Sequence, residues 1–579
     1  MCLDRWRGDA MNLTILDWSI VAIVLLATLG TGLWVRSRAS KSSASFFLGG
    51  RSMPWWLLGT SMVATTFATD TPNLVTGLVR EHGVAGNWGW WCFLLTGMLT
   101  GFVYAKFWRR LGVATDIEFY EIRYSGRPAA FLRGFRAVYI GIFFNVIIMA
   151  TVTLALVKYA NVLFGTSPLV IVVAAGVVTV IFSAAGGLLG VLFTDLLLFV
   201  VSMSGAIMAA YFAVNLPEVG GLASLIANPD LVAKRAFLPD LSDPNQYIPL
   251  LLVPLLIQWW SAWYPGSEPG GGGYVAQRML SAKNERHAAM ATIFFNFAHY
   301  ALRPWPWILV ALASLVVFPD LASIKQALPH VADELVNNDL AYPAMLTFLP
   351  PGFLGIVVAS IVAAYVSTIS TSLNLGSSYV VNDLYLRFLD PNASDRRQIL
   401  VGRVLTVILM VLAGLLALIL ESAVQGFQLL LSVGAGTGLL FFLRWFWKRI
   451  NAWSEISAMA ISFMAALYLH VWAPSDFELW QRFAITVGAT TVGWVLITLL
   501  TPATLPETLR RFDARMRGAS EDASGVVANV AAALVATASV YGLLFGTGFL
   551  IYGNSFVALM MVLASLTALW ACMRQFRQS

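Results

Sequence analysis

Cysteine and histidine are scarce in this chain of 579 residues, which contains three cysteines and five histidines. The cysteines (Cys2, Cys92 and Cys572) lie far apart, so they provide neither the spacing of a metal site nor a disulfide framework. A membrane enzyme would require paired acids or a metal cluster at one place. Five histidines in the whole chain argue against a histidine-rich centre. The sequence therefore does not point to an enzyme.

Charged residues are also scarce. They make up 11% of the chain, whereas 59% of its residues are hydrophobic. A soluble protein of this length has no use for so much apolar surface, so the composition predicts an all-α polytopic membrane protein with the lipid bilayer as its surroundings. The net charge of +6 then belongs to the loops of a membrane protein, and it gives no reason to expect nucleic acid as a partner.

Long apolar runs predict about fifteen membrane-spanning helices, on a rule of roughly 20 residues per span. We place them at residues 17–36, 55–78, 88–108, 135–163, 168–188, 191–214, 248–264, 288–318, 346–383, 400–421, 423–446, 453–472, 481–502, 527–550 and 552–573.

Arginine and lysine cluster after the odd-numbered spans, for example at Arg109 and Arg110 and at Arg510 and Arg511. The alternate loops contain few cations and several acids (215–247, 319–345 and 473–480). Because cytoplasmic loops collect basic residues, we expect the N-terminus outside and the C-terminus in the cytoplasm, in an inner (plasma) membrane of bacterial type.

Two spans are interrupted by residues that break helices. The span 55–78 contains Asp70 and Pro72 in its middle, and the run from Gln258 to Arg278, QWWSAWYPGSEPGGGGYVAQR, contains two prolines and five glycines. Each interrupted span opens a group of five, and since five is odd the two groups have opposite orientations. Interrupted helices at corresponding positions of inverted repeats indicate the binding site of a transporter.

A run of small hydroxyl residues lies in the third span of the second group, within GIVVASIVAAYVSTISTSLNLGSSYVVNDLY (355–385). On a helix, Ala364, Ser367 and Thr368 share one face, and Ser367, Ser370 and Thr371 share a second. Hydroxyls and freed carbonyls can replace the water shell of a small cation, but small residues also let membrane helices pack closely. The position in the repeat favours ion binding.

Five motifs in this order and spacing resemble the sodium:solute symporter family, which includes the sodium/sugar, sodium/proline and sodium/sialic acid transporters. They are FFLGGRSMPWW (46–56), AAGGLLGVLFTD (184–195), YVAQRMLSAKNE (274–285), AAYVSTISTSLN (363–374) and the weaker FLRWFWKR (442–449). The resemblance implies a leucine-transporter-like fold of two inverted five-helix repeats. One helix precedes the repeats and about four follow them, which gives the divisions 1–45, 46–214, 248–449 and 450–579.

The resemblance also implies sodium ligands. The main site corresponds to the carbonyls of Ala64, Phe67 and Ala364 with the side chains of Ser367 and Thr368. A second site, found in relatives similar to the sialic acid transporter, corresponds to Asp195, Ser367, Ser370 and Thr371, so one or two sodium ions are expected. For Asp195, a role in capping or pairing stays open beside ion binding.

On the substrate side, the positions that correspond to solute contacts, or that lie beside the helix breaks, are Thr66, Asp70, Trp90, Phe93, Asn145, Trp263, Tyr264, His299, Gln425 and Gln428. Arg303 follows His299 by one turn, and it either faces the solute or pairs with Glu268. His299 could instead form hydrogen bonds at a helix interface. The aromatic residues Trp263 and Tyr264 could instead lie at the membrane interface.

The expected function is a sodium-coupled symporter that imports a small polar organic solute by alternating access. If His299 faces the cavity, a sugar, a sugar acid or a small carboxylate is favoured over a hydrophobic amino acid. The alternatives are a sodium-independent or proton-coupled carrier of the same fold, and a transporter-like membrane sensor. A sensor would append a signalling domain, whereas only six residues follow the last predicted span.

Overall fold

The computed structural model describes residues 13–262, 268–420, 434–473, 477–516 and 523–578, and the regular structure of these residues is helical. Ten helices in this part of the chain are long and apolar enough to cross a membrane. Four of the five remaining predicted spans are present as shorter helical pieces, and 423–446 lies partly outside the described residues. The prediction of an all-α polytopic membrane protein is confirmed.

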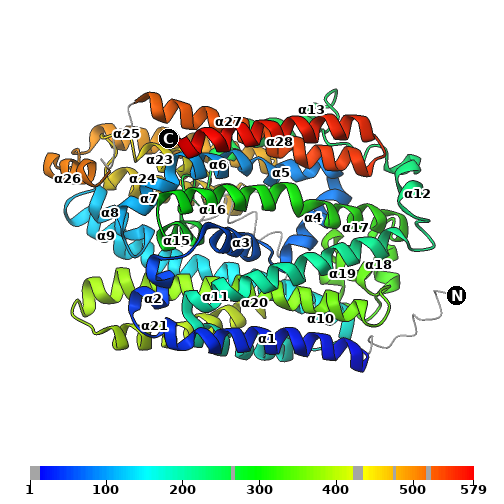
Figure 1. Cartoon of the computed structure of the whole chain (residues 1–579). Coiled ribbons are helices and arrows are strands. Elements are labelled where there is room, and N and C mark those ends of the chain that lie inside the picture. The colour runs from blue at the N-terminus through cyan, green and yellow to red at the C-terminus, as the bar shows by residue number, and fades with distance from the viewer. Residues whose placement is uncertain (1–12, 263–267, 421–433, 474–476, 517–522, 579) are drawn as a thin grey trace.

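Loops of the two predicted classes lie at opposite ends of the helix bundle (Figure 1). At one end are α8 (Phe119–Arg123) and α26 (Pro506–Met516), which belong to the arginine-rich loops. At the other end are α12 (Leu222–Ala227) and α18 (Leu321–Ala327), which belong to loops with few cations. The arginine-rich loops and the loops with few cations thus lie at opposite ends of the bundle, as expected if successive spans alternate in direction.

The first group of spans begins with the interrupted pair α3 (Trp55–Thr66) and α4 (Asp70–His82). It continues with α5 (Trp88–Trp91), α6 (Phe93–Leu99), η4 (Thr100–Tyr104) and α7 (Ala105–Leu111), then α9 (Gly126–Val138), η6 (Tyr139–Phe144) and α10 (Asn145–Phe164), and ends with α11 (Pro168–Val214).

The two predicted spans 168–188 and 191–214 are joined into α11 through a kink at Gly187, whose φ is +50° and ψ −155°. A Cβ at this position would lie 2.7 Å from the carbonyl oxygen of Phe46, so the kink requires glycine both for its backbone angle and for its space. The apolar spans locate this junction to within a few residues, but they do not reveal that the chain kinks there without a polar loop.

The second group begins with η8 (Ile248–Leu252), α14 (Val253–Leu256), η9 (Gln258–Trp260) and α15 (Gly273–Ser281). It continues with α16 (Glu285–Phe297), η10 (Ala298–Leu302) and α17 (Pro304–Val317), α19 (Ala341–Leu346), α20 (Phe353–Tyr379) with η13 (Val380–Leu389), α21 (Asp395–Ala417) and α23 (Gly438–Leu443). Both predicted interruptions are therefore present, between α3 and α4 and between η9 and α15.

The hydroxyl-rich α20 lies at the centre of the bundle, packed against α11, α10, α21 and α1 (Ile15–Ala39). Of its most apolar stretch 83% is buried, compared with 22% for α1. The start of α20 is fixed to α1 because Asp17 accepts hydrogen bonds from the backbone N–H groups of Gly352 and Gly355, both at 2.7 Å. The predicted ion-binding helix is thus shielded from lipid on most sides.

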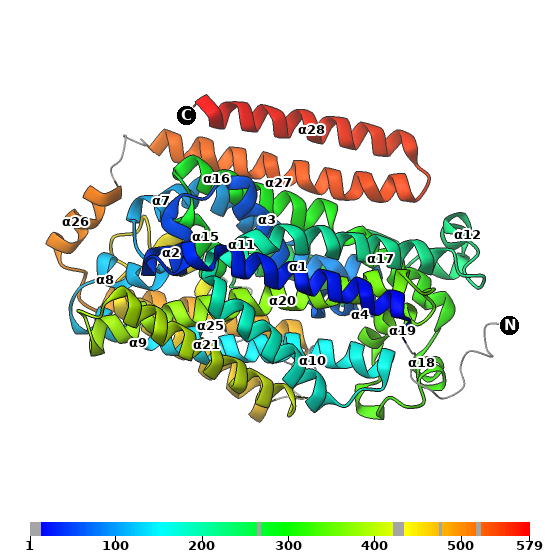
Figure 2. The same cartoon turned by 60° about the horizontal axis from the view of Figure 1, so that its bottom comes forward.

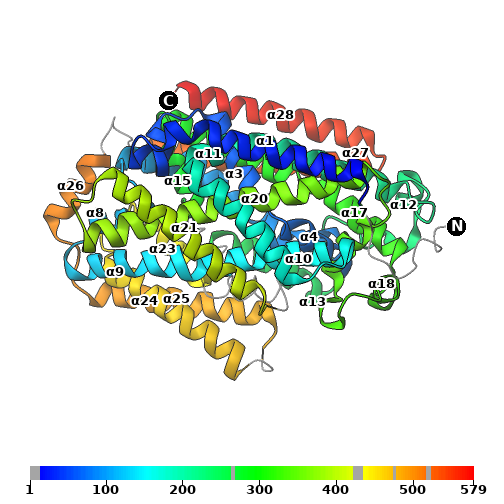
Figure 3. The same ribbon diagram turned by 90° about the horizontal axis from the view of Figure 1, so that it is seen from below.

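Four C-terminal helices flank the two groups. α27 (Ala523–Ile551) and α28 (Ser555–Gln578) form an antiparallel pair on one side (Figure 2), and α24 (Ala452–Leu467) and α25 (Leu479–Leu500) lie along the opposite edge (Figure 3). α27 is attached to the core because Tyr541 donates to the carbonyl of Trp91 at 2.7 Å and Trp305 donates to the carbonyl of Leu544 at 2.9 Å.

Candidate functional site

The break between α3 and α4 frees backbone carbonyls in the middle of the bundle. Phe67 ends α3 with φ −86° and ψ 61°, and its N–H is shared between the carbonyls of Val63 at 3.0 Å and Ala64 at 3.1 Å. Pro72 lies in the first turn of α4, and because it has no N–H it cannot donate to the carbonyl one turn earlier. The helix therefore cannot continue through residues 67–69.

The break faces the hydroxyl helix α20. Thr368 donates from its hydroxyl to the carbonyl of Thr65 at 2.8 Å, which joins α20 to the last turn of α3. The main predicted sodium set lies on these two elements, with Ala64 and Phe67 at the end of α3 and Ala364, Ser367 and Thr368 on α20, and each of the five residues is at most 6% exposed. Neutral oxygens grouped at an unwound turn suit a small monovalent cation. Among the described residues no group of three His, Cys, Asp or Glu could hold a metal ion.

The second predicted sodium set is also brought together, but around an arginine. Asp195 on α11 is fully buried and accepts hydrogen bonds from Ser367 at 2.6 Å and Ser61 at 2.5 Å. Arg278 on α15 places Nη2 3.9 Å from the Asp195 carboxylate and donates to Thr371 at 2.8 Å. The hydroxyl of Ser370 is buried and has no hydrogen-bond partner. An ion pair thus lies in the middle of the second set.

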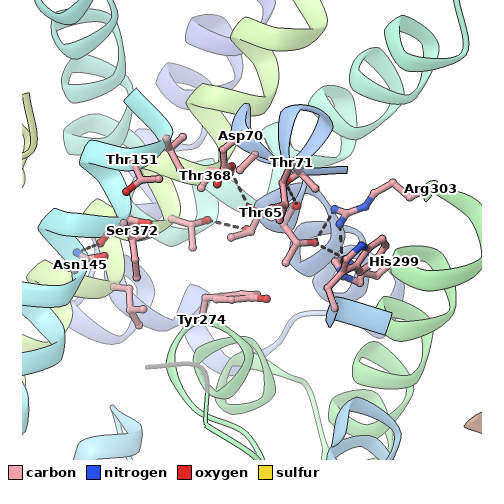
Figure 4. Close-up of a pocket in the computed structure, with 18 of the residues that line it drawn as sticks. Thr65, Asp70, Thr71, Asn145, Thr151, Tyr274, His299, Arg303, Thr368 and Ser372 are labelled. Atoms are coloured by element: carbon pink, nitrogen blue, oxygen red, sulfur yellow. Dashed lines mark hydrogen bonds between the residues drawn. The ribbon is translucent and has the colours of Figure 1, made fainter. Parts of the chain in front are cut away.

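A cavity of about 140 Å³ lies beside the helix break, between α4, α10, α20 and η10 (Figure 4). Five of the predicted solute contacts line it: Thr66, Asp70, Trp90, Asn145 and His299. Phe93 lines a neighbouring cavity of about 60 Å³, and Tyr274 borders both. Trp263, Tyr264, Gln425 and Gln428 lie outside the described residues.

Beside Arg303 and the predicted sodium ligands, six further polar residues line the main cavity and were not predicted as solute contacts: Thr65, Thr71, Thr151, Tyr274, Ser372 and Tyr379. Ser372 follows Thr368 by four residues on α20, so the helical period of the hydroxyl run could have identified it. Tyr274 directly follows the glycine run, where the sequence gives no indication of which way the chain turns. Figure 4 shows Arg303 and His299 on one side of the cavity and Asn145, Thr151 and Ser372 on the other.

Arg303 faces the cavity and does not pair with Glu268. Its Nη1 donates to the hydroxyl of Thr66 at 3.0 Å, and its guanidinium lies 5.6 Å from the ring centre of Phe67 and 5.0 Å from that of Trp307. The predicted alternative of an Arg303–Glu268 pair is wrong because Glu268 pairs with Arg136 instead. His299 lies next to Thr66, with Nδ1 3.1 Å from the threonine hydroxyl.

The glycine-rich segment before α15 folds against the arginine-rich end of the first group. The carbonyl of Gly270 accepts a hydrogen bond from Trp108 at 2.8 Å, and the N–H of Gly273 donates to Asp116 at 3.0 Å. Gly270, Gly271 and Gly273 all have positive φ, which explains why glycine is required there. Asp116 also accepts from Tyr379 at 2.7 Å, so this segment closes one end of the cavity region onto α20.

Asp116 lies in a loop outside the membrane-spanning segments, and its environment shifts its acidity. Burial is the main cause, and the nearby charge of Glu268 adds to it, so the pKa of Asp116 rises to about 6 despite the hydrogen bonds from Tyr379 and Gly273. The carboxyl group therefore changes its charge close to physiological pH.

Comparison with known proteins agrees with this architecture. The family model of the sodium:solute symporter family matches residues 46–461. A sodium/glucose cotransporter of Vibrio parahaemolyticus is 27% identical over 475 residues, which cover 79% of this chain and 86% of that protein. A sodium/mannose cotransporter of Bos taurus is 24% identical over 503 residues, covering 80% and 81%.

Among solved structures, an outward-open, substrate-bound Na⁺-coupled sialic acid symporter matches with a TM-score of 0.67 and 22% identity. The match covers 85% of this chain and all of that chain. At this identity the likeness shows the fold alone, and it confirms the predicted leucine-transporter-like architecture.

Proposed function

The chain belongs to the sodium:solute symporter family, and we propose that it imports a small polar organic solute together with sodium by alternating access. A sugar, a sugar acid or a small carboxylate is the solute class that the sequence favours. The observation that carries the proposal is the break at residues 67–69, which lies against the hydroxyls of α20 and at the wall of a buried cavity. Ion and solute positions side by side are what coupling requires.

In this proposal the main sodium ion is held by the carbonyls of Ala64, Phe67 and Ala364 and by the hydroxyls of Ser367 and Thr368. The hydrogen bond from Thr368 to the carbonyl of Thr65 supports it, since this contact joins the two elements that would share the ion. With the ion present, the hydroxyl oxygens offer lone pairs to the ion, and its charge is balanced by carbonyl dipoles without another formal charge.

The second set, Asp195, Ser367, Ser370 and Thr371, is a candidate site for a further cation. Arg278 is already a cation beside Asp195, and a sodium ion added there would leave a net positive charge in a fully buried place. We therefore propose one sodium ion per solute, with Arg278 balancing the charge of Asp195.

The solute is proposed to occupy the cavity bordered by Thr66, Asp70, Trp90, Asn145 and His299. Phe93, Trp263, Tyr264, Gln425 and Gln428 remain predicted contacts. The protein is proposed to lie in an inner (plasma) membrane of bacterial type with its N-terminus outside and its C-terminus in the cytoplasm, so that the glycine-rich closure lies on the cytoplasmic side. The repeats correspond to 46–214 and 248–449, between the divisions 1–45 and 450–579.

The test is uptake by the purified protein in proteoliposomes. A panel of labelled sugars, amino acids and carboxylates is offered with an inward gradient of sodium, potassium or protons. We expect at least one solute to accumulate only with sodium. Equal uptake with potassium would favour a sodium-independent carrier, and uptake driven by a proton gradient alone would favour proton coupling.

A further inference from the structure

Arg303 is a buried cation that makes no direct ion pair with any described residue, and the acid whose charge acts on it is Asp70. It is 1% exposed, and no ion pair in the described part of the chain includes it. Its contacts are the carbonyl of Val63, the hydroxyl of Thr66, the ring of His299 and the faces of two aromatic rings, and its Nε has no hydrogen-bond partner. A guanidinium held in this way is stabilised by ring quadrupoles and dipoles, but its charge is not neutralised.

Asp70 is the counterpart of Arg303 at the same cavity. It is the first residue of the half-helix α4, and its Oδ1 is buried with no hydrogen-bond partner. No direct ion pair in the described ranges includes Asp70, so Asp70 and Arg303 border one cavity without a direct contact, while their opposite charges attract each other across it. Each is a charged group with one unsatisfied atom, and a buried unsatisfied charge is costly unless a ligand completes it.

Several neutral hydrogen-bond donors around the cavity are already engaged with the backbone. Six lining residues donate to main-chain carbonyls at 2.8–3.3 Å: Thr65, Thr66, Thr71, Asn145, Thr151 and Thr368. The hydroxyl oxygens keep lone pairs, so they can accept hydrogen bonds but not donate them. A solute rich in hydroxyl groups needs both kinds of partner, whereas an ammonium group needs acceptors only.

We propose that the transported solute is a small zwitterion, whose carboxylate lies against Arg303 and whose protonated amine lies against Asp70. The proposal rests on the proposed symport function and narrows its small-carboxylate class to carboxylates that also carry an amine. Opposite charges on one solute satisfy both protein charges at once, while a neutral polyol satisfies neither fully. An anion without an amine would leave Asp70 unpaired.

The apolar walls of the cavity agree with a solute that has a short carbon skeleton between its charged ends. Trp90, Leu74, Val75 and Val152 supply apolar walls between the polar ends, which suits the short carbon skeleton of an amino acid or a betaine.

The experiment compares solutes that share a skeleton and differ in charge. Proteoliposomes with the full chain are offered alanine, β-alanine, 4-aminobutyrate and proline, each beside its hydroxy acid or deaminated acid and its uncharged-carboxyl amide, with galactose as the neutral polyol. We expect sodium-dependent uptake of at least one zwitterion, and at least roughly ten-fold weaker competition by both of its partners.

Two variants assign the ends of the solute. Asp70→Asn is expected to remove most of the preference for the amine over the hydroxyl, and Arg303→Gln most of the preference for the carboxylate over the amide. Asp230→Asn, an exposed acid far from the cavity, is the matched control for removing a carboxylate. If either variant fails to fold, Asp70→Ser or Arg303→Met, which also removes the charge, replaces it, and the same loss of preference is expected.

The outcomes separate this proposal from the proposed function. Sodium-dependent uptake of galactose or a hydroxy acid, with no zwitterion competing, would overturn the zwitterion and leave sodium symport standing. A preference for the amine that survives in Asp70→Asn would overturn the role of Asp70. Uptake of a zwitterion without any need for sodium would instead overturn the proposed function.

Discussion

Thr368 offers the sharpest test of the main sodium site, because its hydroxyl already connects the two elements that would share the ion. In the structure it donates to the carbonyl of Thr65 at 2.8 Å, and it is 6% exposed. Thr368→Val keeps the shape of the side chain and removes this oxygen, one of about five that would surround sodium. The variant therefore removes a ligand without creating a large cavity.

The expected loss follows from the cost of one contact to a buried charge. A lost contact of ~1–3 kcal/mol raises the sodium concentration for half-maximal uptake by about 5- to 150-fold. Thr368→Ser retains the oxygen and should remain within a few-fold of the natural protein. Thr406→Val is the matched control, because Thr406 is also buried and its hydroxyl bonds only within its own helix, to the carbonyl of Gly402 at 2.9 Å.

Two measurements distinguish a lost ligand from a damaged fold. The first is sodium-dependent uptake in proteoliposomes, and the second is the shift of the melting temperature by sodium alone, in detergent, with potassium as the comparison. Both should require more sodium in Thr368→Val and remain unchanged in Thr406→Val. If Thr368→Val keeps the sodium dependence of the natural protein in both assays, the assignment of the main site is refuted.

Three further predictions follow from the buried polar groups. The reversal potential of transport should give one sodium ion per solute, and a ratio of two would show that Arg278 does not prevent a second ion from binding near Asp195. His299→Ala should raise the solute concentration for half-maximal uptake, since His299 contacts Thr66 and lies beside Arg303; uptake with normal solute affinity would remove it from the site. The pKa of Asp116 is about 6 in the folded protein and near 3.8 in the unfolded chain. Ionised Asp116 therefore lowers the free energy of unfolding above pH 6, and protonation of Asp116 in the folded protein regains this free energy as the pH falls from 6 towards 4. When the pH is lowered from 7 to 5, the melting temperature of the natural protein should therefore rise relative to that of Asp116→Asn. Parallel pH profiles of the two melting temperatures would contradict this.

The fold could be predicted because each span carries its own signal. Apolar length and the alternation of basic loops depend on local sequence, so ten long helices and both interruptions were found from the sequence. The division of α11 near Gly187 was also predicted, but the form of the junction, a kink without a loop, was not, because it depends on the positive φ of Gly187 and on its contact with Phe46. Such a contact joins residues far apart in the chain, and no spacing rule reports it.

The candidate site shows the same division. Thr66 and Asp70 were identified from their place beside a helix break and His299 from the family resemblance, and all three border the cavity. The partners of charged side chains were not identifiable. Glu268 turns away from Arg303 to Arg136 because the glycine segment folds back through three residues of positive φ, and Arg278 reaches Asp195 from a different repeat. Where side chains are long or the chain turns at glycines, the sequence does not determine which partner a charged group reaches. Only the packing of the helices determines it.

The buried charges together determine what a transport cycle moves. Asp195 is balanced by Arg278 and Glu268 by Arg136, and the main sodium set contains no formal charge. If a zwitterion pairs with Asp70 and Arg303, the charges at the proposed ion and solute sites are balanced except that of one sodium ion. Each cycle then carries one net positive charge, which at a membrane potential of ~100 mV contributes ~2.3 kcal/mol, or roughly 50-fold in the solute ratio, before any sodium gradient is counted.

A monoanionic solute would cancel the sodium charge and make the cycle electroneutral, so the current recorded during uptake of the transported solute distinguishes a zwitterion from a monoanion. A neutral sugar would also give current, but Asp70 and Arg303 would then lack partners of opposite charge on the solute. Current together with amine selectivity is therefore the combination that this arrangement of charges requires.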